Sequence, residues 1–494
     1  MLRTRRFRHA GLEPTPENYA TAPRKHLRAE CPGSFGLTVR DAFRMKIAEN
    51  ETGRIPTTPL PPAGAGPQVR ADGLGRTGPG ETAIDWIGRL IAFDTTSRNS
   101  NLGLIEEVRD RLSGLGFVCR TTHDKSGAKA NLLASLPAGD GRLDGGLCLS
   151  GHVDTVPVDG QTWSSDPFSA DIRQDRLYGR GACDMKGFVG TAIAVAVAHA
   201  DRPLTAPIHL ALSYDEEVGC LGAPALVEDI VAQGLIPDGC IVGEPTMMQV
   251  VNAHKGANVA RCRVGGLARH SSLAPEGINA IEYAARLIVH IQSMAGRFAA
   301  EGPFSEGFNV PFTTLQTGLV TGGIAVNTVP ADCDFTFEFR NLPGVPADAI
   351  FREIEDHALG RLLPEMRTPN ACGCITLERL ASAPAFEAED GSPFTRLVRE
   401  ITGDHMMRKV AYGTEAGIFH QAGIPTLVCG PGDIAQAHRA DEFVDLAQIR
   451  RCEHVLTELV ARMCGAVAGA PISAPSQDPI PAPSGTGDGR RMIG

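Results

Sequence analysis

The sequence predicts an α/β protein, in which a catalytic domain with a largely parallel sheet is interrupted by an inserted ferredoxin-like βαββαβ domain. The chain has 494 residues, which is more than one ordinary domain holds. Apolar strand-like runs alternate with helical patterns over much of the chain, as in βαβ units. From about residue 255 to 382 this alternation gives way to a second order of elements.

The catalytic part is expected to begin near Thr82, where Ile84, Ile87, Leu90 and Ile91 recur at helical spacing. Further helices are predicted at Leu104–Leu115, Phe188–His199 and Ala223–Gln233. The predicted strands are Asn131–Leu136, Gly146–Ser150, Pro207–Ser213, Cys240–Gly243 and Thr426–Gly430, with the sheet resuming after the insertion near Val410. Such alternation is typical of a parallel sheet covered by helices.

The inserted segment reads in order as strand, helix, two strands, helix and strand. The expected ranges are Asn258–Val264, Asn279–Met294, Phe312–Leu319, Cys333–Arg340, Ala347–Leu359 and Cys374–Leu380. This βαββαβ order indicates a small ferredoxin-like sandwich. The expected organisation is a disordered leader over 1–80, catalytic halves over 81–254 and 383–467, a lid over 255–382, and a disordered tail over 468–494.

Composition excludes several classes of protein. The net charge of −10 argues against a nucleic-acid binder. No apolar run reaches the roughly 18–20 residues that a membrane span requires. The arginine-rich start has no apolar core typical of a secretory signal. The thirteen cysteines form no CxxC pair, and this favours reduced, mostly buried thiols in a cytoplasmic protein.

Five residues with metal-binding chemistry follow apolar runs or lie in Gly- and Pro-rich turns: His152, Asp184, Glu217, Glu244 and His438. Side chains at the carboxyl ends of parallel strands gather at one edge of the sheet. Imidazole and carboxylate together suit zinc or a similar divalent ion. Five ligands are too many for one catalytic zinc and suit two metals with a bridging carboxylate.

Two further carboxylates stand beside these ligands. Asp154 follows His152 by two residues and is expected to orient its imidazole. Glu216 precedes Glu217 in an acidic turn, so one carboxylate of the pair could bind metal while the other moves protons.

The motifs GHVDTVP, GRGACDMKG, DEE, GEPT, AHKG, GTEAG and GPGDIAQAH occur in one order, and together they resemble the M20 metallopeptidase/deacylase family. The resemblance extends over about residues 82–466. It implies a zinc-peptidase-like α/β catalytic domain interrupted by a lid that dimerises. It further implies two divalent ions, Zn²⁺ or alternatively Co²⁺, with Asp184 as their bridge.

The same resemblance implies roles for other residues. Glu216 would be the general base, and His270 would stabilise the oxyanion from the partner subunit of a homodimer. Asn327 and Arg340 would contact a substrate carboxylate, for which a guanidinium is well suited. Glu415 would pair with a cationic substrate side chain and repel an anionic acyl group.

The activity that the resemblance implies is removal of the acetyl group from N2-acetyl-L-ornithine, in the biosynthesis of arginine. The alternatives are N-succinyl-diaminopimelate or a broader range of N-acyl amino acids and dipeptides as substrates. Outside the hydrolases, the alternative is a non-catalytic metal-binding dimer scaffold, which would be expected to lose ligands or the base.

Overall fold

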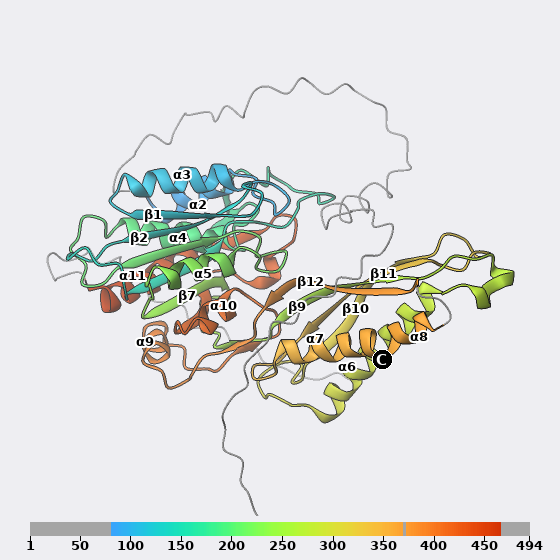
Figure 1. The fold of residues 1–494 in the computed structure, drawn as a ribbon. Coiled ribbons are helices and arrows are strands. Elements are labelled where there is room, and N and C mark those ends of the chain that lie inside the picture. Colours follow the sequence, from blue (N-terminus) through green and yellow to red (C-terminus); the bar gives the residue numbers. More distant parts are fainter. Residues whose placement is uncertain (1–80, 369–371, 466–494) are drawn as a thin grey trace, which may run out of the picture. The chain divides into compact units, whose positions relative to one another are not determined.

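The computed structural model describes residues 81–368 and 372–465. Figure 1 shows two α/β parts in this range, each with its own sheet, and each sheet has its own hydrophobic core. The predicted fold class, a catalytic α/β domain with a lid domain, is confirmed. The predicted leader over 1–80 and the tail over 468–494 lie outside the described residues.

The large part is built on a sheet whose described strands run in the order β1-β2-β6-β3-β7-β15. Strands β6, β3, β7 and β15 are parallel, whereas the pairs β1–β2 and β2–β6 are antiparallel. The bounds are Val118–His123 (β1), Ala130–Leu136 (β2), Leu147–His152 (β3), Ile208–Ser213 (β6), Gly239–Pro245 (β7) and Thr426–Gly430 (β15). All residues of β2, β3, β6, β7 and β15 are buried, so helices and loops must cover both faces.

Helix α4, Lys186–Val197, is buried along its whole length and contacts β3, β6 and β7. Its Gly, Ala and Val side chains are small enough for α2 and α11 to pack on its outer side. The other helices of this part are α2 (Ala83–Ile91), α3 (Leu102–Ser113), α5 (Ala223–Ala232), α9 (Pro393–Thr402), α10 (Ala416–Gln421) and α11 (Leu446–Met463).

A helix begins near Thr82, where one was predicted, and a reciprocal cap closes the start of α2. The Thr82 hydroxyl accepts the Asp85 N–H at 3.3 Å, and the Asp85 carboxylate accepts the Thr82 N–H at 2.9 Å. Both bonds satisfy N–H groups that a helix start leaves unpaired.

The prediction that the main sheet resumes near Val410 is wrong. Val410 belongs to β14 (Lys409–Val410), which pairs with β8 (Ala253–His254) in a small sheet that also contains β13 (Phe386–Glu387). A second small sheet joins β4 (Asp171–Arg173), β5 (Arg176–Tyr178) and β16 (Phe443–Asp445). Strand β1 was not predicted, because it is polar and partly exposed and lacks an apolar run.

The smaller part is a four-stranded antiparallel sheet in the described chain, with the order β10-β11-β9-β12. Its strands are β9 (Ala257–Gly265), β10 (Thr314–Gly322), β11 (Asp332–Arg340) and β12 (Cys374–Ala383). Helix α6 (Ala280–Glu301) follows β9, after the 3-10 turn Ser271–Glu276, and α7 (Ala347–Glu355) follows β11. Chain order and strand order are those of a ferredoxin-like sandwich, as predicted.

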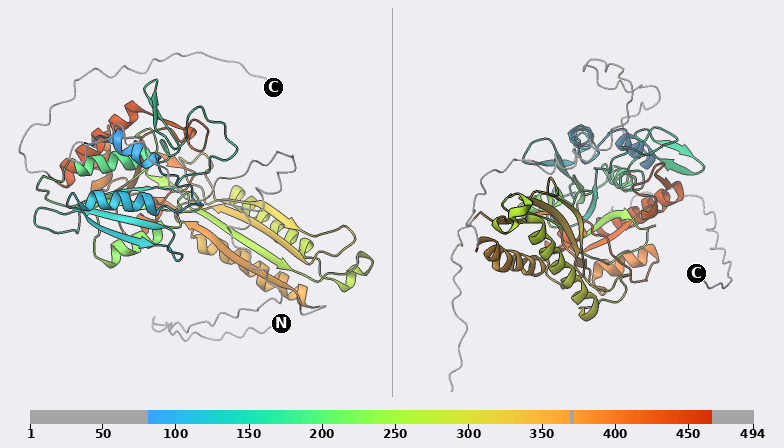
Figure 2. Two further views of the ribbon diagram at one scale, coloured as in Figure 1. Left: turned by 90° about the horizontal axis from the view of Figure 1, so that it is seen from above. Right: turned by 90° about the vertical axis from the view of Figure 1, so that its right-hand side faces the viewer.

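Helices α6 and α7 lie together on one face of this sheet (Figures 1 and 2). The predicted helix Ala347–Leu359 is α7 together with part of a π-helical turn, Asp356–Leu362, which leads into α8 (Leu363–Arg367). We propose residues 255–382 as the lid domain, between catalytic halves 81–254 and 383–467.

In the described residues, no helix combines the length and the apolar character needed to cross a membrane.

Candidate metal centre

The five predicted ligands meet at the edge where the parallel strands end. His152 is the last residue of β3, Glu244 lies near the end of β7, and Glu217 is in the turn after β6. Asp184 precedes α4, and His438 follows the short 3-10 turn Ile434–Gln436. The parallel order of β6, β3 and β7 brings the first three together, as expected for an open α/β sheet.

Asp184 lies between two imidazoles. Its Oδ1 is 3.1 Å from His152 Nε2, and its Oδ2 is 3.3 Å from His438 Nε2. His438 Nε2 is also 3.0 Å from Glu217 Oε2. Each oxygen of this carboxylate therefore faces a different histidine, which is the arrangement that a carboxylate shared by two ions requires.

Two groups of side chains offer ligand atoms that lie within 4.8 Å of one another. The first is His152, Asp184 and Glu217, and the second is His152, Glu216 and Glu244. The donor set is imidazole and carboxylate, which suits zinc and other first-row divalent ions. The residues present therefore fit a pair of metal ions, and Glu216 lies within the same cluster as the ligands.

Asp154 holds both His152 and the acidic turn. His152 Nδ1 lies 3.0 Å from the Asp154 carbonyl oxygen and 3.4 Å from its Oδ1. The two carboxylate oxygens accept the N–H groups of Glu216 at 3.0 Å and Glu217 at 3.3 Å. These contacts leave Nε2 of His152 as the ring nitrogen that faces Asp184.

The three glutamates of the cluster hold protons more firmly than usual, whereas hydrogen bonds to His152 and His438 lower the pKa of Asp184. Burial raises the pKa of Glu216 to about 8, and nearby carboxylates add to this effect although His152 opposes it. Burial and Asp184 raise the pKa of Glu217 to about 7, although His438 opposes this. Burial also raises the pKa of Glu244 well above its usual value. So much negative charge in one buried place suits a site that receives cations.

Metal-free protein, prepared with a chelator, is expected to lose stability as the pH rises from about 5 to about 9. Glu217 and Glu216 have folded pKa values of about 7 and 8, above the ordinary 4.5. Hydrogen bonds to Asp184 and Glu217 raise the pKa of His438 from 6.5 to about 10. At these three groups the folded state therefore binds more protons than the unfolded state, and the stability that they contribute disappears as the pH passes the folded values.

The check is the urea midpoint of chelated protein at three pH values across this window. Metal-loaded protein should show a weaker fall, because the ligands bind metal in their deprotonated forms. A midpoint of the chelated protein that rises with pH would contradict the prediction.

The expectation that Glu415 meets the substrate does not fit its surroundings. Its side chain is 0% exposed, and its two oxygens accept hydrogen bonds from Ser150 Oγ and Ser213 Oγ, each at 2.6 Å. Ser150 is two residues before His152, and Ser213 ends β6. Glu415 therefore links β3 and β6 through these two serines. Because both of its oxygens already have partners, it is not placed to bind a substrate side chain.

The lid residues form two separate groups. His270 and Asn327 lie on neighbouring loops, joined by the bond from Ser271 N–H to the Asn327 carbonyl at 2.9 Å and by the bridge between His270 and Thr328. Arg340 ends β11 and donates to Glu338 at 3.1 Å. The structure does not bring Arg340 together with the other two within the lid sheet.

Sequence reasoning missed Cys220, whose thiol donates to Glu216 Oε1 at 3.3 Å. Its position four residues after Glu216 was the available signal.

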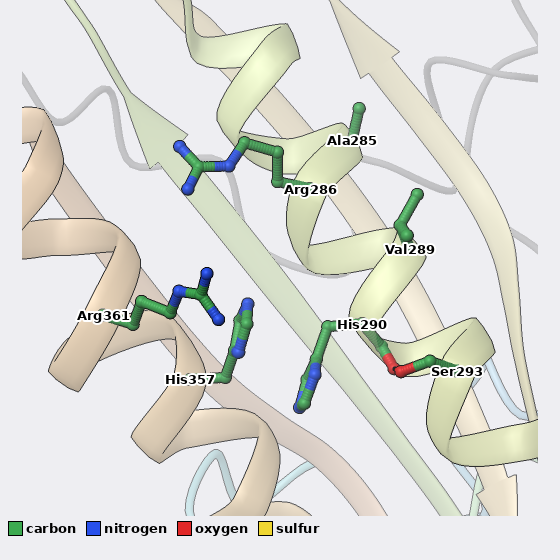
Figure 3. Close-up of a pocket in the computed structure, with 7 residues that line it drawn as sticks. All are labelled: Ala285, Arg286, Val289, His290, Ser293, His357 and Arg361. Atoms are coloured by element: carbon green, nitrogen blue, oxygen red, sulfur yellow. Dashed lines mark hydrogen bonds between the residues drawn. The ribbon is translucent and has the colours of Figure 1, made fainter. Parts of the chain in front are cut away.

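A separate hollow of about 370 Å³ lies between α6 and the π-helical turn (Figure 3). It is lined by none of the predicted site residues; its stacked rings are those of His290 and His357, with centroids 3.8 Å apart.

Curated relatives match almost along their whole length. An acetylornithine deacetylase from Myxococcus xanthus is 35% identical over 390 residues, which cover 76% of this chain and 96% of the relative. An acetylornithine deacetylase from Proteus mirabilis is 34% identical over 378 residues, covering 76% and 93%.

Solved structures show the same fold at low identity. An M20 family metallo-carboxypeptidase from Sulfolobus solfataricus has a TM-score of 0.60 and 17% identity, covering 77% of this chain and 98% of that chain. A dinuclear metal binding peptidase from the M20 family of Bacillus subtilis has a TM-score of 0.54 and 13% identity, covering 78% and 98%. The family model described as peptidase family M20/M25/M40 matches residues 148–462. The candidate ligands lie at one edge of the sheet, and the family model covers most of the described catalytic part and the lid. The chain therefore belongs to peptidase family M20/M25/M40.

Proposed function

We propose that this chain is a metal-dependent amidohydrolase that removes the acetyl group from N2-acetyl-L-ornithine, giving L-ornithine and acetate. The observation that carries the proposal is Asp184, whose two oxygens face His152 and His438. The relatives named acetylornithine deacetylase support acetylornithine as the substrate. In this role the enzyme would supply ornithine for arginine biosynthesis in the cytoplasm.

We assign two divalent ions, Zn²⁺ or alternatively Co²⁺, to the cluster. His152 and Glu244 would hold one ion, Glu217 and His438 would hold the other, and Asp184 would hold both. When bound, such a pair activates water and polarises the carbonyl of the scissile amide. The similar Bacillus subtilis protein, which is named a dinuclear metal binding peptidase, supports two ions.

Glu216 would serve as the general base. It would take a proton from the attacking water and pass it to the leaving amine of ornithine, so that the proton count balances over the reaction. Its backbone N–H is fixed by Asp154, and its carboxylate receives the Cys220 thiol. These contacts hold the proton-transfer group in one place beside the ligands.

Arg340 would bind the α-carboxylate of the substrate, and His270 and Asn327 would reach a site from the lid of a second copy. Eight residue steps of β11 separate Asp332 from Arg340, about 26 Å of extended strand. His270 and Asn327 lie beyond the Asp332 end, whereas the chain enters and leaves the lid at the other end, at Ala257 and Ala383. One copy therefore offers Arg340 and His270 at opposite ends of its lid.

An exposed apolar edge on the lid supports a homodimer. Leu319 and Val320 on the edge strand β10 are 53% and 61% exposed, and Ile324 and Val326 in the next loop are 90% and 104% exposed. This loop is the one that carries Asn327. An exposed edge strand is a template for pairing with another chain, and large exposed apolar patches mark interaction sites. A second copy would cover this edge while delivering His270.

Mixing two inactive variants, His270→Ala and Glu216→Gln, is expected to restore activity. In a mixed dimer, one site would combine the intact Glu216 of one subunit with the intact His270 of the partner subunit. Random mixing should recover about one quarter of wild-type activity, since half of the dimers are mixed and each has one complete site. The measurement is kcat of the mixture after subunit exchange, against each variant alone.

The control adds Val320→Lys and Val326→Lys to both inactive variants. These proteins should be monomeric by light scattering, and their mixture should be as inactive as each variant alone. Activity of the mixed variants no greater than the sum of the separate ones would rule out the shared site.

The substrate class is tested by measuring hydrolysis by zinc-loaded protein with a panel of substrates. The panel contains N-acetylornithine, N-succinyl-diaminopimelate, other N-acyl amino acids and dipeptides. N-acetylornithine should give the highest kcat/KM. A preference for the succinyl substrate would transfer the assignment to a desuccinylase. Absence of hydrolysis together with absence of bound metal would point to a scaffold.

Glu415→Gln is expected to lower kcat and thermal stability with little change in KM for N-acetylornithine. The reason is that Glu415 holds Ser150 and Ser213 rather than facing solvent. Steady-state kinetics and the Tm of this variant are the check. A large rise in KM with unchanged kcat would restore the direct contact with the ornithine side chain.

A further inference from the structure

A buried carboxylate holds the loop that carries Asp184. Glu442 accepts the N–H groups of Gly181 at 3.1 Å, Cys183 at 2.8 Å and Asp184 at 3.0 Å. It also accepts from Arg180 Nη1 at 2.6 Å. The side chains of Arg180 and Glu442 are 1% and 0% exposed. Bonds from charged groups in such a buried place are strong and directional, so the Asp184 backbone has little freedom.

The same arginine reaches toward His438 through one glutamine. Arg180 Nη2 donates to Gln161 Oε1 at 2.7 Å, and Gln161 Nε2 donates to the His438 carbonyl at 3.1 Å. The Trp163 indole N–H also donates to Gln161 Oε1 at 3.1 Å, which fixes the orientation of the amide. His438 has a φ of 63°, a left-handed conformation that residues other than glycine seldom adopt without support.

These contacts form one chain from the backbone of Asp184 to the backbone of His438. Glu442 lies four residues after His438, so the network contacts both ends of the connection from His438 to β16. Gln161 belongs to a loop far in sequence from His438 and Glu442, 277 residues from His438. The side chains of Asp184 and His438 meet at 3.3 Å between Oδ2 and Nε2, while Glu442 and Gln161 bind their backbones.

We propose that Gln161, Arg180 and Glu442 are a positioning network that sets the distance between Asp184 and His438 for the ion that these two residues share. The proposal deepens the proposed function and rests on it. The network acts through backbone groups, because its bonds to Asp184 and His438 go to a main-chain N–H and a main-chain carbonyl. Loss of its contact with His438 should therefore weaken the ion held by His438 and Glu217 more than the ion held by His152 and Glu244.

Gln161 gives the sharpest test, because it is only partly buried and its replacement leaves the Arg180–Glu442 pair intact. For Gln161→Ala, competition with a chelator should show one of the two zinc sites weakened by roughly 10–100-fold, the range for residues that orient metal ligands. The other site should be unchanged, and so should the Tm of chelated protein. Gln161→Glu should behave like Gln161→Ala, because a carboxylate keeps the acceptor for Arg180 but loses the donor to His438.

Three comparisons complete the experiment. Gln233→Ala, an exposed glutamine at the end of α5, is the matched control and should bind both ions as wild type does. The visible absorption of cobalt-loaded Gln161→Ala should change for one site only, a signature that loss of general stability would not give. Glu442→Gln should weaken both ions, because it loosens the backbone of Asp184 itself.

Wild-type zinc affinity at both sites in Gln161→Ala would overturn the network. The proposed function fails differently: wild-type protein would then bind no pair of ions, or His438→Ala and Asp184→Asn would leave the metal count unchanged. If wild type binds two ions and His438→Ala removes one, the result for Gln161→Ala decides the network alone.

Discussion

Replacing Glu216 by glutamine is expected to lower kcat by roughly 10²–10⁴-fold, the usual contribution of a positioned general base. Glutamine has nearly the same shape, but its amide cannot accept the proton of the attacking water. Burial raises the pKa of Glu216 to about 8, and bound cations would lower it toward the neutral range in which a base works best. The protein should keep both ions, which metal analysis checks alongside steady-state kinetics.

Glu217→Gln is the matched comparison, because it changes the adjacent residue in the same way. His438 Nε2 lies 3.0 Å from Glu217 Oε2, so this variant should lose one ion as well as activity. A near-normal rate in Glu216→Gln would exclude Glu216 as the base, and loss of metal as in Glu217→Gln would make it a ligand. The test matters because Glu216 lies in a candidate ligand group with His152 and Glu244.

Replacing Asp184 by asparagine is expected to remove both ions and abolish hydrolysis. The two oxygens of Asp184 face different histidines, at 3.1 Å and 3.3 Å, whereas asparagine offers a single oxygen and no charge. The bridging position between His152 and His438 would therefore lose its shared ligand. Metal analysis after dialysis, with kcat for N-acetylornithine, is the measurement.

His438→Ala should by contrast remove one ion and leave the other. A single lost ion in Asp184→Asn would show that Asp184 serves one metal only, and the two-metal assignment would have to be redrawn. Folding of both variants is checked by circular dichroism of chelated protein, because Asp184 contacts His152 and His438 in the metal-free site and its replacement is expected to lower the stability of the apo protein.

The sequence predicted most elements of both sheets because most of their strands are apolar runs with clear ends. Strand β15 occupies Thr426–Gly430, as predicted, and the βαββαβ order of the lid was read correctly from periodicity. Strand β1 and the small sheets escaped, because short or polar strands carry no apolar run. The π-helical turn after α7 has no signal in the helical repeat at all.

The candidate ligands could be chosen from the sequence because each is a metal-binding type placed after a strand or in a Gly- and Pro-rich turn, and parallel strands share one edge. The contacts of Glu415, Cys220 and Gln161 could not be predicted. Glu415 is bonded to serines 265 and 202 residues away, and the acidic side chain in a Gly-rich motif gave no sign that it would be enclosed.

By itself, the sequence determined which side chains are candidates to bind metal, which carboxylate is the candidate base, and which strands and turns carry them. Only the tertiary structure decided which oxygen of Asp184 faces which histidine, and which buried groups hold those ligands in place. The physical reason is that side-chain type and apolar period are local properties of the chain. Contact partners depend instead on strand order and on loops such as those of Gln161 and Glu442, brought together from distant positions by packing of the whole domain.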